Sequence, residues 1–229
     1  MFSDLYHKLF SDFYHSFYYC SLLLASLISI FLFKKVQAPF RWLAILVVLT
    51  LISELMAKYI HLISGNNSIV YHFFTPLEYF FYANIFYRLF KKKNWNTFLI
   101  ASVLLLIILE LLNTKYLQNL EVVNTNIAIV ESIYLVFLSL MLFVSIRTSL
   151  ASENILKEGV FWFNSIVLIY YTFNILISGF HSFKVYQFQN PPMVIYQINF
   201  LLSGLLYLVY ALSMILNVVA KRKTTASNE

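Results

Sequence analysis

Three glutamates, Glu54, Glu78 and Glu131, each lie inside a long apolar segment of this 229-residue sequence. A carboxylate near the centre of a lipid bilayer is costly unless it is paired or neutralised, so each one requires an explanation. With the rise of an α-helix, all three are about 13 to 15 Å from the same end of their segments. We therefore hypothesise that they line one polar cavity. Because three ionised acids repel one another, at least one is expected to be protonated or paired with Lys58 or a histidine.

Other polar side chains lie at helical spacing from these acids. Glu54, Lys58 and His61 occupy positions i, i+4 and i+7 and so share one stripe of a helix. The full set of candidate cavity residues is Glu54, Lys58, His61, His72, Thr75, Glu78, Tyr82, Asn124, Glu131, Asn174 and Asn199. Hydrogen bonding between helices is the alternative role for the asparagines and tyrosines, at about 0.6 kcal/mol per bond. Such bonding does not need a carboxylate, so the three acids favour a functional cavity.

No catalytic, cofactor or metal motif accompanies these residues. The sequence contains no Gly-rich phosphate loop, Gly-x-Ser-x-Gly or His-Glu-x-x-His. The segment 193–219 contains no lysine, which argues against a retinal Schiff base. Near the N-terminus a repeat brings Asp4, His7, Asp12 and His15 into a pattern that could bind a metal, but alternating aromatic and polar residues also suit an interfacial helix. We assign no catalytic residue, cofactor or metal ion.

The composition predicts an all-α membrane protein. Hydrophobic residues make up 61% and charged residues 11% of the chain, whereas a soluble domain has about 25% charged residues. Seven apolar segments approach or exceed the length of a membrane span. These segments are 17–33, 42–64, 69–90, 98–112, 122–146, 160–180 and 193–219. We therefore predict an interfacial segment at 1–16, a seven-helix bundle at 17–219 and a short basic cytoplasmic tail at 220–229.

The distribution of lysine and arginine predicts the orientation of the bundle. Of the 16 basic residues, 12 lie after the first, third and fifth segments or in the C-terminal tail. These are Lys34, Lys35, Arg41, Arg88, Lys91, Lys92, Lys93, Arg147, Lys157, Lys221, Arg222 and Lys223; the other four are Lys8, Lys58, Lys115 and Lys184. Because basic residues are retained on the cytoplasmic side, the N-terminus is expected outside and the C-terminus in the cytoplasm. Topology and anionic lipid headgroups explain the net charge of +6 better than nucleic acid does.

Two short motifs resemble a known group of proteins. One is His72-Phe-Phe-Thr-Pro-Leu-Glu78-Tyr-Phe-Phe-Tyr82, and the other is Phe161-Trp162-Phe163-Asn164 at the start of the sixth segment. With the seven-segment layout, they resemble uncharacterised seven-helix inner-membrane proteins of Bacteroidota. The resemblance implies a location in a bacterial inner membrane, but it implies no particular activity.

Three functions are compatible with a polar cavity in the outer half of such a bundle. The first is a small receptor or sensor-type subunit without an output domain of its own, which would need a separate signalling partner in addition to the lipid bilayer. The second is a transporter or permease for a small solute, as in bundles built from two related three-helix halves. The third is an intramembrane enzyme that modifies a lipid, with Glu54, His61, His72 and Glu78 as acid and base. The absence of a catalytic motif favours the first.

Overall fold

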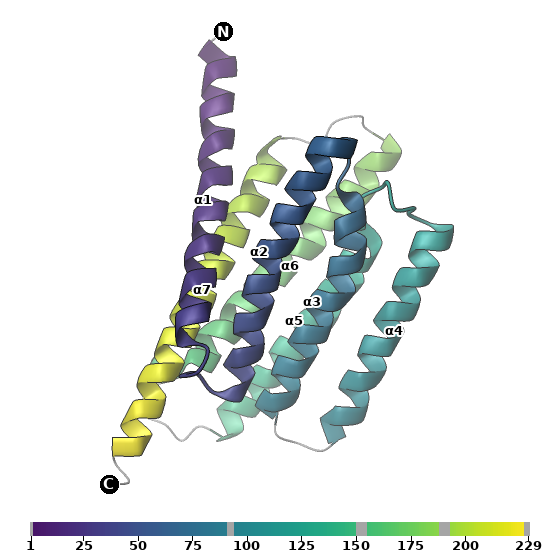
Figure 1. Cartoon of the computed structure of the whole chain (residues 1–229). Helices are drawn as coiled ribbons and strands as arrows, with labels where there is room; N and C mark the ends of the chain where they lie inside the picture. Colours follow the sequence, from purple (N-terminus) through teal and green to yellow (C-terminus); the bar gives the residue numbers. More distant parts are fainter. Residues whose placement is uncertain (1, 91–93, 150–154, 188–192, 227–229) are drawn as a thin grey trace.

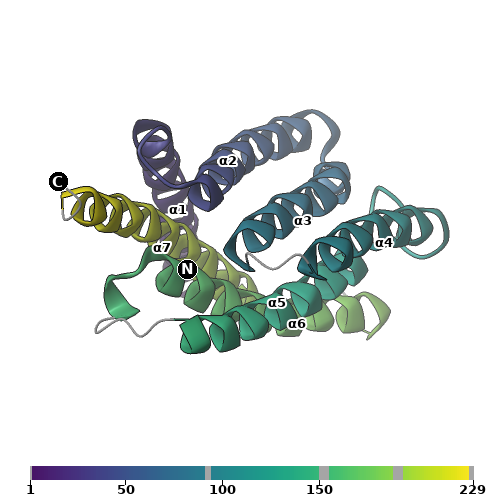
Figure 2. The same cartoon turned by 90° about the horizontal axis from the view of Figure 1, so that it is seen from below.

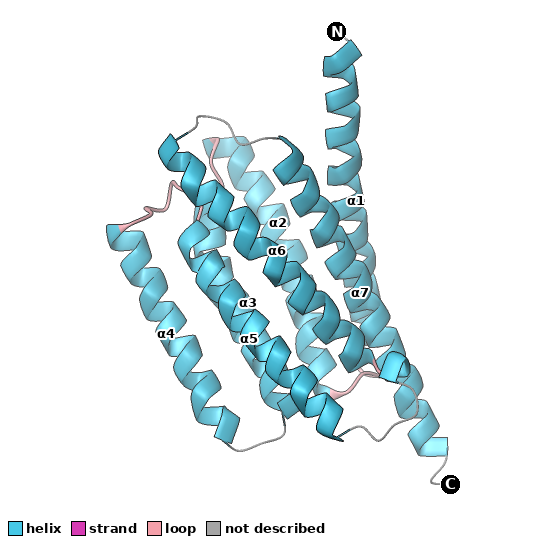
Figure 3. Cartoon of the chain, turned by 180° about the vertical axis from the view of Figure 1, so that it is seen from behind, coloured by secondary structure: helices cyan, strands magenta, loops and turns pink. Residues whose placement is uncertain are grey.

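The chain folds into long α-helices, as the composition predicts. The computed structural model describes residues 2–90, 94–149, 155–187 and 193–226. The helices are α1 (Phe2–Leu32), α2 (Ala38–Ser64), α3 (Ser68–Phe90), α4 (Asn94–Tyr116), α5 (Thr125–Ser149), α6 (Gly159–Gln187) and α7 (Met193–Ala226), with a short 3₁₀-helix η1 (Ile155–Lys157). Within these described ranges no strand is present (Figure 3).

Six of the helices are long and apolar enough to cross a membrane. The spans that meet this criterion are Phe13–Leu32, Ala38–Ser64, Thr97–Tyr116, Thr125–Ile146, Gly159–Ser182 and Val194–Lys221. They make the protein compatible with several passes through a bilayer. Helix α3 is as long as α4, at 23 residues, but its tyrosines and residues such as His72, Glu78 and Arg88 make it more polar. It therefore falls outside this set although the sequence predicts a span there.

The helices form two layers when viewed along the bundle (Figure 2). Helices α1, α2, α3 and α4 follow one another in one layer, and α7, α6 and α5 form the other. Contacts between α1 and α7 and between α4 and α5 join the layers at their two edges, and α3 also packs on α5. Neighbours in sequence are thus neighbours in space, as short connections require.

The two ends of the bundle differ in the connections that they hold (Figure 1). We call the end with connections 65–67 and 117–124 the upper end, and the end with connection 33–37 and η1 the lower end. Six of the basic residues predicted to be cytoplasmic lie towards the lower end and have described side chains: Lys34, Lys35, Arg41, Arg88, Lys157 and Lys221. The side chains of Lys8, Lys91, Lys92, Lys93, Arg147, Lys184, Arg222 and Lys223 lie outside the described part.

The segment 1–16 does not form a helix of its own. From Phe2 onward it belongs to α1, which continues to Leu32 and extends past the upper end of the bundle (Figure 1). No Pro or Gly interrupts α1, so the helix has no residue that would break it where the apolar span begins. The predicted interfacial location of this segment stays a prediction.

Small residues allow α7 to pack closely on its neighbours. A Cβ atom on Gly204 would lie 2.3 Å from a ring carbon of Phe17 on α1. A Cβ atom on Gly159 would lie 2.2 Å from the backbone oxygen of Ser213. Close approach of this kind is how helices associate in lipid, where the hydrophobic effect between helices is absent.

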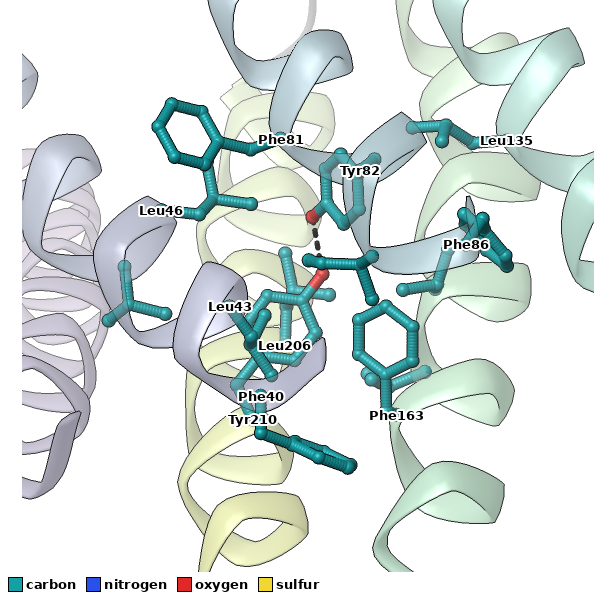
Figure 4. Close-up of a cluster of buried hydrophobic side chains, with 14 of the residues drawn as sticks. Phe40, Leu43, Leu46, Phe81, Tyr82, Phe86, Leu135, Phe163, Leu206 and Tyr210 are labelled. Carbon is teal, nitrogen blue, oxygen red and sulfur yellow. Dashed lines mark hydrogen bonds between the residues drawn. The ribbon is translucent and has the colours of Figure 1, made fainter. Parts of the chain in front are cut away.

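The outer surface of the bundle suits a lipid solvent. Large apolar side chains face outward, with Phe31 75% and Leu62 78% exposed. A cluster of buried side chains in the lower half is apolar and mainly aromatic (Figure 4). The labelled side chains of this buried cluster are Phe40, Leu43, Leu46, Phe81, Tyr82, Phe86, Leu135, Phe163, Leu206 and Tyr210. We call this set the aromatic layer.

Candidate functional site

A cleft of about 820 Å³ lies in the upper half, between α1, α2, α3 and α7. We call it the upper cleft. Its lining residues are His15, Ser16, Tyr19, Cys20, Glu54, Ala57, Lys58, His61, Asn67, Tyr71 and Phe200. The volume is in the range of small-molecule sites, about 300 to 1,000 Å³. Of the predicted cavity residues, Glu54, Lys58 and His61 line this cleft, so the stripe on α2 faces one space.

The Glu54 carboxyl is half-buried and surrounded by phenol groups. The Tyr71 hydroxyl donates to Glu54 Oε1 over 3.5 Å, which is a long hydrogen bond. The phenol groups of Tyr18 and Tyr19 on α1 approach the same carboxyl. Helix α1 therefore supplies aromatic side chains to an acid that α2 carries.

Lys58 and His61 are exposed nearer the mouth of the upper cleft. The Lys58 ammonium lies 5.2 Å from the centre of the Tyr19 ring, in a cation–π contact. Among the described residues no ion pair joins Lys58 to Glu54, although they are one helical turn apart. The predicted pairing is replaced by contact with an aromatic ring.

Glu78 faces α6 and lies outside the lining of the upper cleft. Its Oε1 accepts a hydrogen bond of 3.0 Å from the Tyr171 hydroxyl. One turn further down α3, the hydroxyl of Tyr82 is hydrogen-bonded to that of Tyr210 on α7 (Figure 4).

Glu131 is 3% exposed, and its Oε1 has no hydrogen-bond partner within the part of the chain that the structure describes. Of the three predicted acids, only Glu54 lines the upper cleft. Glu78 is bonded to Tyr171 on α6 and Glu131 is buried, so a cavity shared by all three stays a prediction.

Glu110 on α4, which is not among the predicted site residues, is buried at 7% exposure. His72 Nδ1 lies 2.7 Å from Glu110 Oε1, and His72 Nε2 lies 2.9 Å from the backbone oxygen of Val122. Since a carbonyl oxygen only accepts, Nε2 carries a hydrogen. A proton must then also lie between Nδ1 and Oε1, so either an imidazolium or a carboxylic acid is present.

Asparagines extend this pair into a larger network at the upper end. Asn124 Nδ2 donates to Glu110 Oε2 over 2.7 Å, and Asn113 Nδ2 donates to Asn124 Oδ1 over 3.0 Å. Asn126 Nδ2 donates to Asn113 Oδ1 over 2.9 Å. We call His72, Glu110, Asn113, Thr114, Asn124 and Asn126 the upper network. It ties α3, α4 and the 117–124 connection to α5. The spacing of Glu110, Asn113 and Thr114 at i, i+3 and i+4 is the sequence signal that could have identified it.

The remaining predicted site residues contact neighbouring backbone or side chains. The Thr75 hydroxyl donates to the backbone oxygen of Tyr71 over 2.8 Å. Asn174 Nδ2 donates to Ser132 Oγ on α5 over 2.9 Å. Asn199 Oδ1 is buried without a hydrogen-bond partner among the described residues. None of the three lines the upper cleft.

A second cleft of about 560 Å³ lies at the lower end, between the ends of α2, α3, α5 and α6. We call it the lower cleft. It is lined in part by Gln37, Arg88, Ser145 and Glu158. The Arg88 guanidinium also lies 5.6 Å from the centre of the Trp42 ring. The aromatic layer lies between the two clefts along the bundle axis.

The described residues contain no group of three or more His, Cys, Asp or Glu side chains that could hold a metal ion. The side chains of Asp4, His7 and Asp12, which the sequence suggested as possible ligands, lie outside the described part. His15 instead contacts the ring of Phe200, with ring centres 4.1 Å apart.

No protein family, curated protein or solved structure matches the chain. The resemblance to Bacteroidota inner-membrane proteins therefore stays a prediction, and the function is argued from the geometry alone.

Proposed function

We propose that the protein is a receptor or sensor-type membrane subunit that binds a small ligand in the upper cleft. The single observation that carries the proposal is the cleft itself: it reaches a half-buried carboxylate, while the aromatic layer closes the interior beneath it. A cleft that is open at one end and closed below suits binding and sensing. Helices α2 and α3, which line the upper cleft, also line the lower cleft and so connect the two.

The proposal includes a seven-pass topology with the upper end outside. Helix α3 is counted as a span because it packs on α2, α4 and α5 and has the length of α4. The basic residues at the lower end support a cytoplasmic C-terminus. A bacterial inner membrane and a separate signalling partner belong to the same proposal.

Cysteine labelling in intact cells tests this topology. With Cys20→Ser as background, Asn67→Cys should react with an impermeant maleimide and Lys157→Cys should not. Both positions lie in connections at opposite ends. Labelling at residue 157 with protection at residue 67 would overturn the orientation.

A comparison of transcript levels between wild-type, deletion and variant strains tests the proposed sensor function. Glu54→Gln keeps the shape of the side chain but removes its charge, so it should reproduce the transcript changes caused by deleting the gene. Glu121→Gln is the matched control, because Glu121 is exposed at the same end and lies outside the upper cleft. Both variants must reach wild-type amounts in the membrane. Wild-type transcript levels in the Glu54→Gln strain would refute the proposed sensor function.

A transporter is the second candidate, and the lower cleft is the observation that favours it. Two clefts at opposite ends with a closed layer between them suit alternating access. Uptake of a bound solute into proteoliposomes, lost in Glu54→Gln, would favour transport over sensing. The lipid-modifying enzyme receives no such support, because His72 pairs with Glu110 and not with Glu78.

A further inference from the structure

The upper cleft arranges opposite charges along one face of α2. Glu54 is half-buried in the deeper part, whereas Lys58 and His61 are exposed one and two turns nearer the upper end. Residues one turn apart on a helix have Cβ atoms about 5 to 6 Å apart. The complementary ligand therefore carries a positive group at its deep end and a negative group at its outer end, joined by a short linker.

The deep part of the upper cleft suits an organic ammonium group. Tyr19 and Tyr71 line it beside Glu54, and the phenol of Tyr18 approaches the same carboxyl. Aromatic ring faces attract cations, and a carboxylate accepts hydrogen bonds from an ammonium. The Lys58 ammonium over the Tyr19 ring shows that this ring is accessible to a cation within the cleft.

The mouth of the upper cleft suits a phosphate group. Lys58 presents three N–H donors on a flexible side chain, and His61 and Asn67 line the same opening. A lysine ammonium binds phosphate as a point charge. If the Lys58 ammonium moved from the Tyr19 ring to the phosphate of a ligand, the ring would be free to contact the ligand's own ammonium group.

Exposed apolar side chains at the level of the mouth indicate that it lies close to a lipid surface. Tyr59, Leu62 and Ile63 are 65%, 78% and 69% exposed and lie at the same level of α2 as His61, on other faces of the helix. A ligand can therefore reach the cleft from solution or as the headgroup of a lipid. The free molecule and the lipid headgroup would present the same charged groups to the cleft.

Building on the proposed function, we propose that the upper cleft binds a phosphorylated amine, with the ammonium on Glu54 and the phosphate on Lys58 and His61. Phosphoethanolamine, free or as a lipid headgroup, is the simplest molecule of this class.

Calorimetry on the full chain in nanodiscs of phosphatidylglycerol tests the ligand class, with O-phosphoethanolamine as the probe. Inorganic phosphate and ethylamine, titrated separately, should each bind about tenfold more weakly or worse, since each meets only one of the two charges. Equal affinity for inorganic phosphate and O-phosphoethanolamine would overturn the proposal.

Two variants test the two ends of the ligand. Glu54→Gln should reduce the affinity for O-phosphoethanolamine to that for inorganic phosphate, and Lys58→Gln should reduce it to that for ethylamine. Lys115→Gln is the matched control: the Lys115 ammonium lies 5.0 Å from the Tyr116 ring in the same kind of contact, but outside the cleft. Since Lys58 is exposed, its variant tests the site even if Glu54→Gln unfolds. Wild-type affinity in Lys58→Gln would contradict the proposed phosphate contact.

Nanodiscs that contain phosphatidylethanolamine distinguish the two sources. If the lipid is the ligand, its headgroup occupies the cleft and the calorimetric signal of O-phosphoethanolamine disappears; if the free molecule is the ligand, the signal is unchanged. Either result supports the ligand class. Absence of binding in both kinds of nanodisc overturns it, and the transcript experiment then decides separately whether the cleft still acts in sensing.

Discussion

The upper and lower halves of the bundle are held together by different chemistry. In the upper half, Glu110 accepts hydrogen bonds from Asn124 and pairs with His72. In the lower half, aromatic rings pack with few polar partners, as in the stack of Phe90 on Trp95 with ring centres 4.4 Å apart. Polar bonds select one arrangement of the helices, while close packing supplies most of the attraction between helices in lipid. The upper cleft, with its half-buried Glu54, lies in the half that contains the polar network.

The upper half itself contains two kinds of buried acid. Both oxygens of Glu110 have partners, whereas one oxygen of Glu131 has none within the described residues. A fully bonded acid is best explained as structural. An acid without a full set of partners is not needed to hold the helices together, so its replacement should have the opposite effect on stability.

The largest expected effect is in the aromatic layer. Phe163 is fully buried against Phe40, Phe86 and Tyr210. Phe163→Ala leaves a cavity and should lower the free energy of unfolding by about 3 to 5 kcal/mol. Phe73→Ala is the control, because Phe73 is 71% exposed on the lipid-facing surface. Unfolding in detergent measures both, and an equal loss would contradict the role given to the aromatic layer.

The upper network should give the next largest effect. Glu110→Gln keeps the volume but removes the carboxyl group that shares a proton with His72, so we expect a loss of about 1.5 to 3 kcal/mol in unfolding free energy. Glu121→Gln, at an exposed acid of the same end, should change little. If both variants melt like the wild type, the network does not stabilise the upper half.

A smaller effect of opposite sign is expected at Glu131. Glu131→Gln replaces a buried carboxyl group, one oxygen of which has no described hydrogen-bond partner. The free energy of unfolding should stay the same or rise by about 1 kcal/mol. A clear drop in melting temperature in detergent would show that the carboxylate is structural after all.

The smallest effect is expected for a single neutral hydrogen bond between helices. Asn174→Ala removes the bond to Ser132 and should cost about 0.6 kcal/mol. A double-mutant cycle with Ser132→Ala isolates the contribution of this bond. A coupling energy as large as the effect of Glu110→Gln would contradict the distinction between a single hydrogen bond between helices and the upper network.

The positions of the helices could be read from the sequence because a bilayer restricts the chain so strongly. Every backbone group in lipid must be bonded within its own helix, so an apolar run of sufficient length predicts a helix. The segment 42–64 corresponds to Ala38–Ser64, and Gly65, at φ 74°, ends that helix in the left-handed conformation that glycine adopts easily. The predicted segment 69–90 likewise corresponds to α3, Ser68–Phe90, although this helix is too polar to meet the criterion for a membrane span.

The sequence by itself determined that α2 carries Glu54, Lys58 and His61 on one stripe, because helical periodicity is local. Only the tertiary structure decided that this stripe faces α1 and its tyrosines, and that Glu78 bonds to Tyr171 on α6. It also decided that His72 pairs with Glu110, which is 38 positions away. Periodicity says which residues share a face, but the partner of that face depends on the rotation of each helix about its axis, and packing between helices sets that rotation.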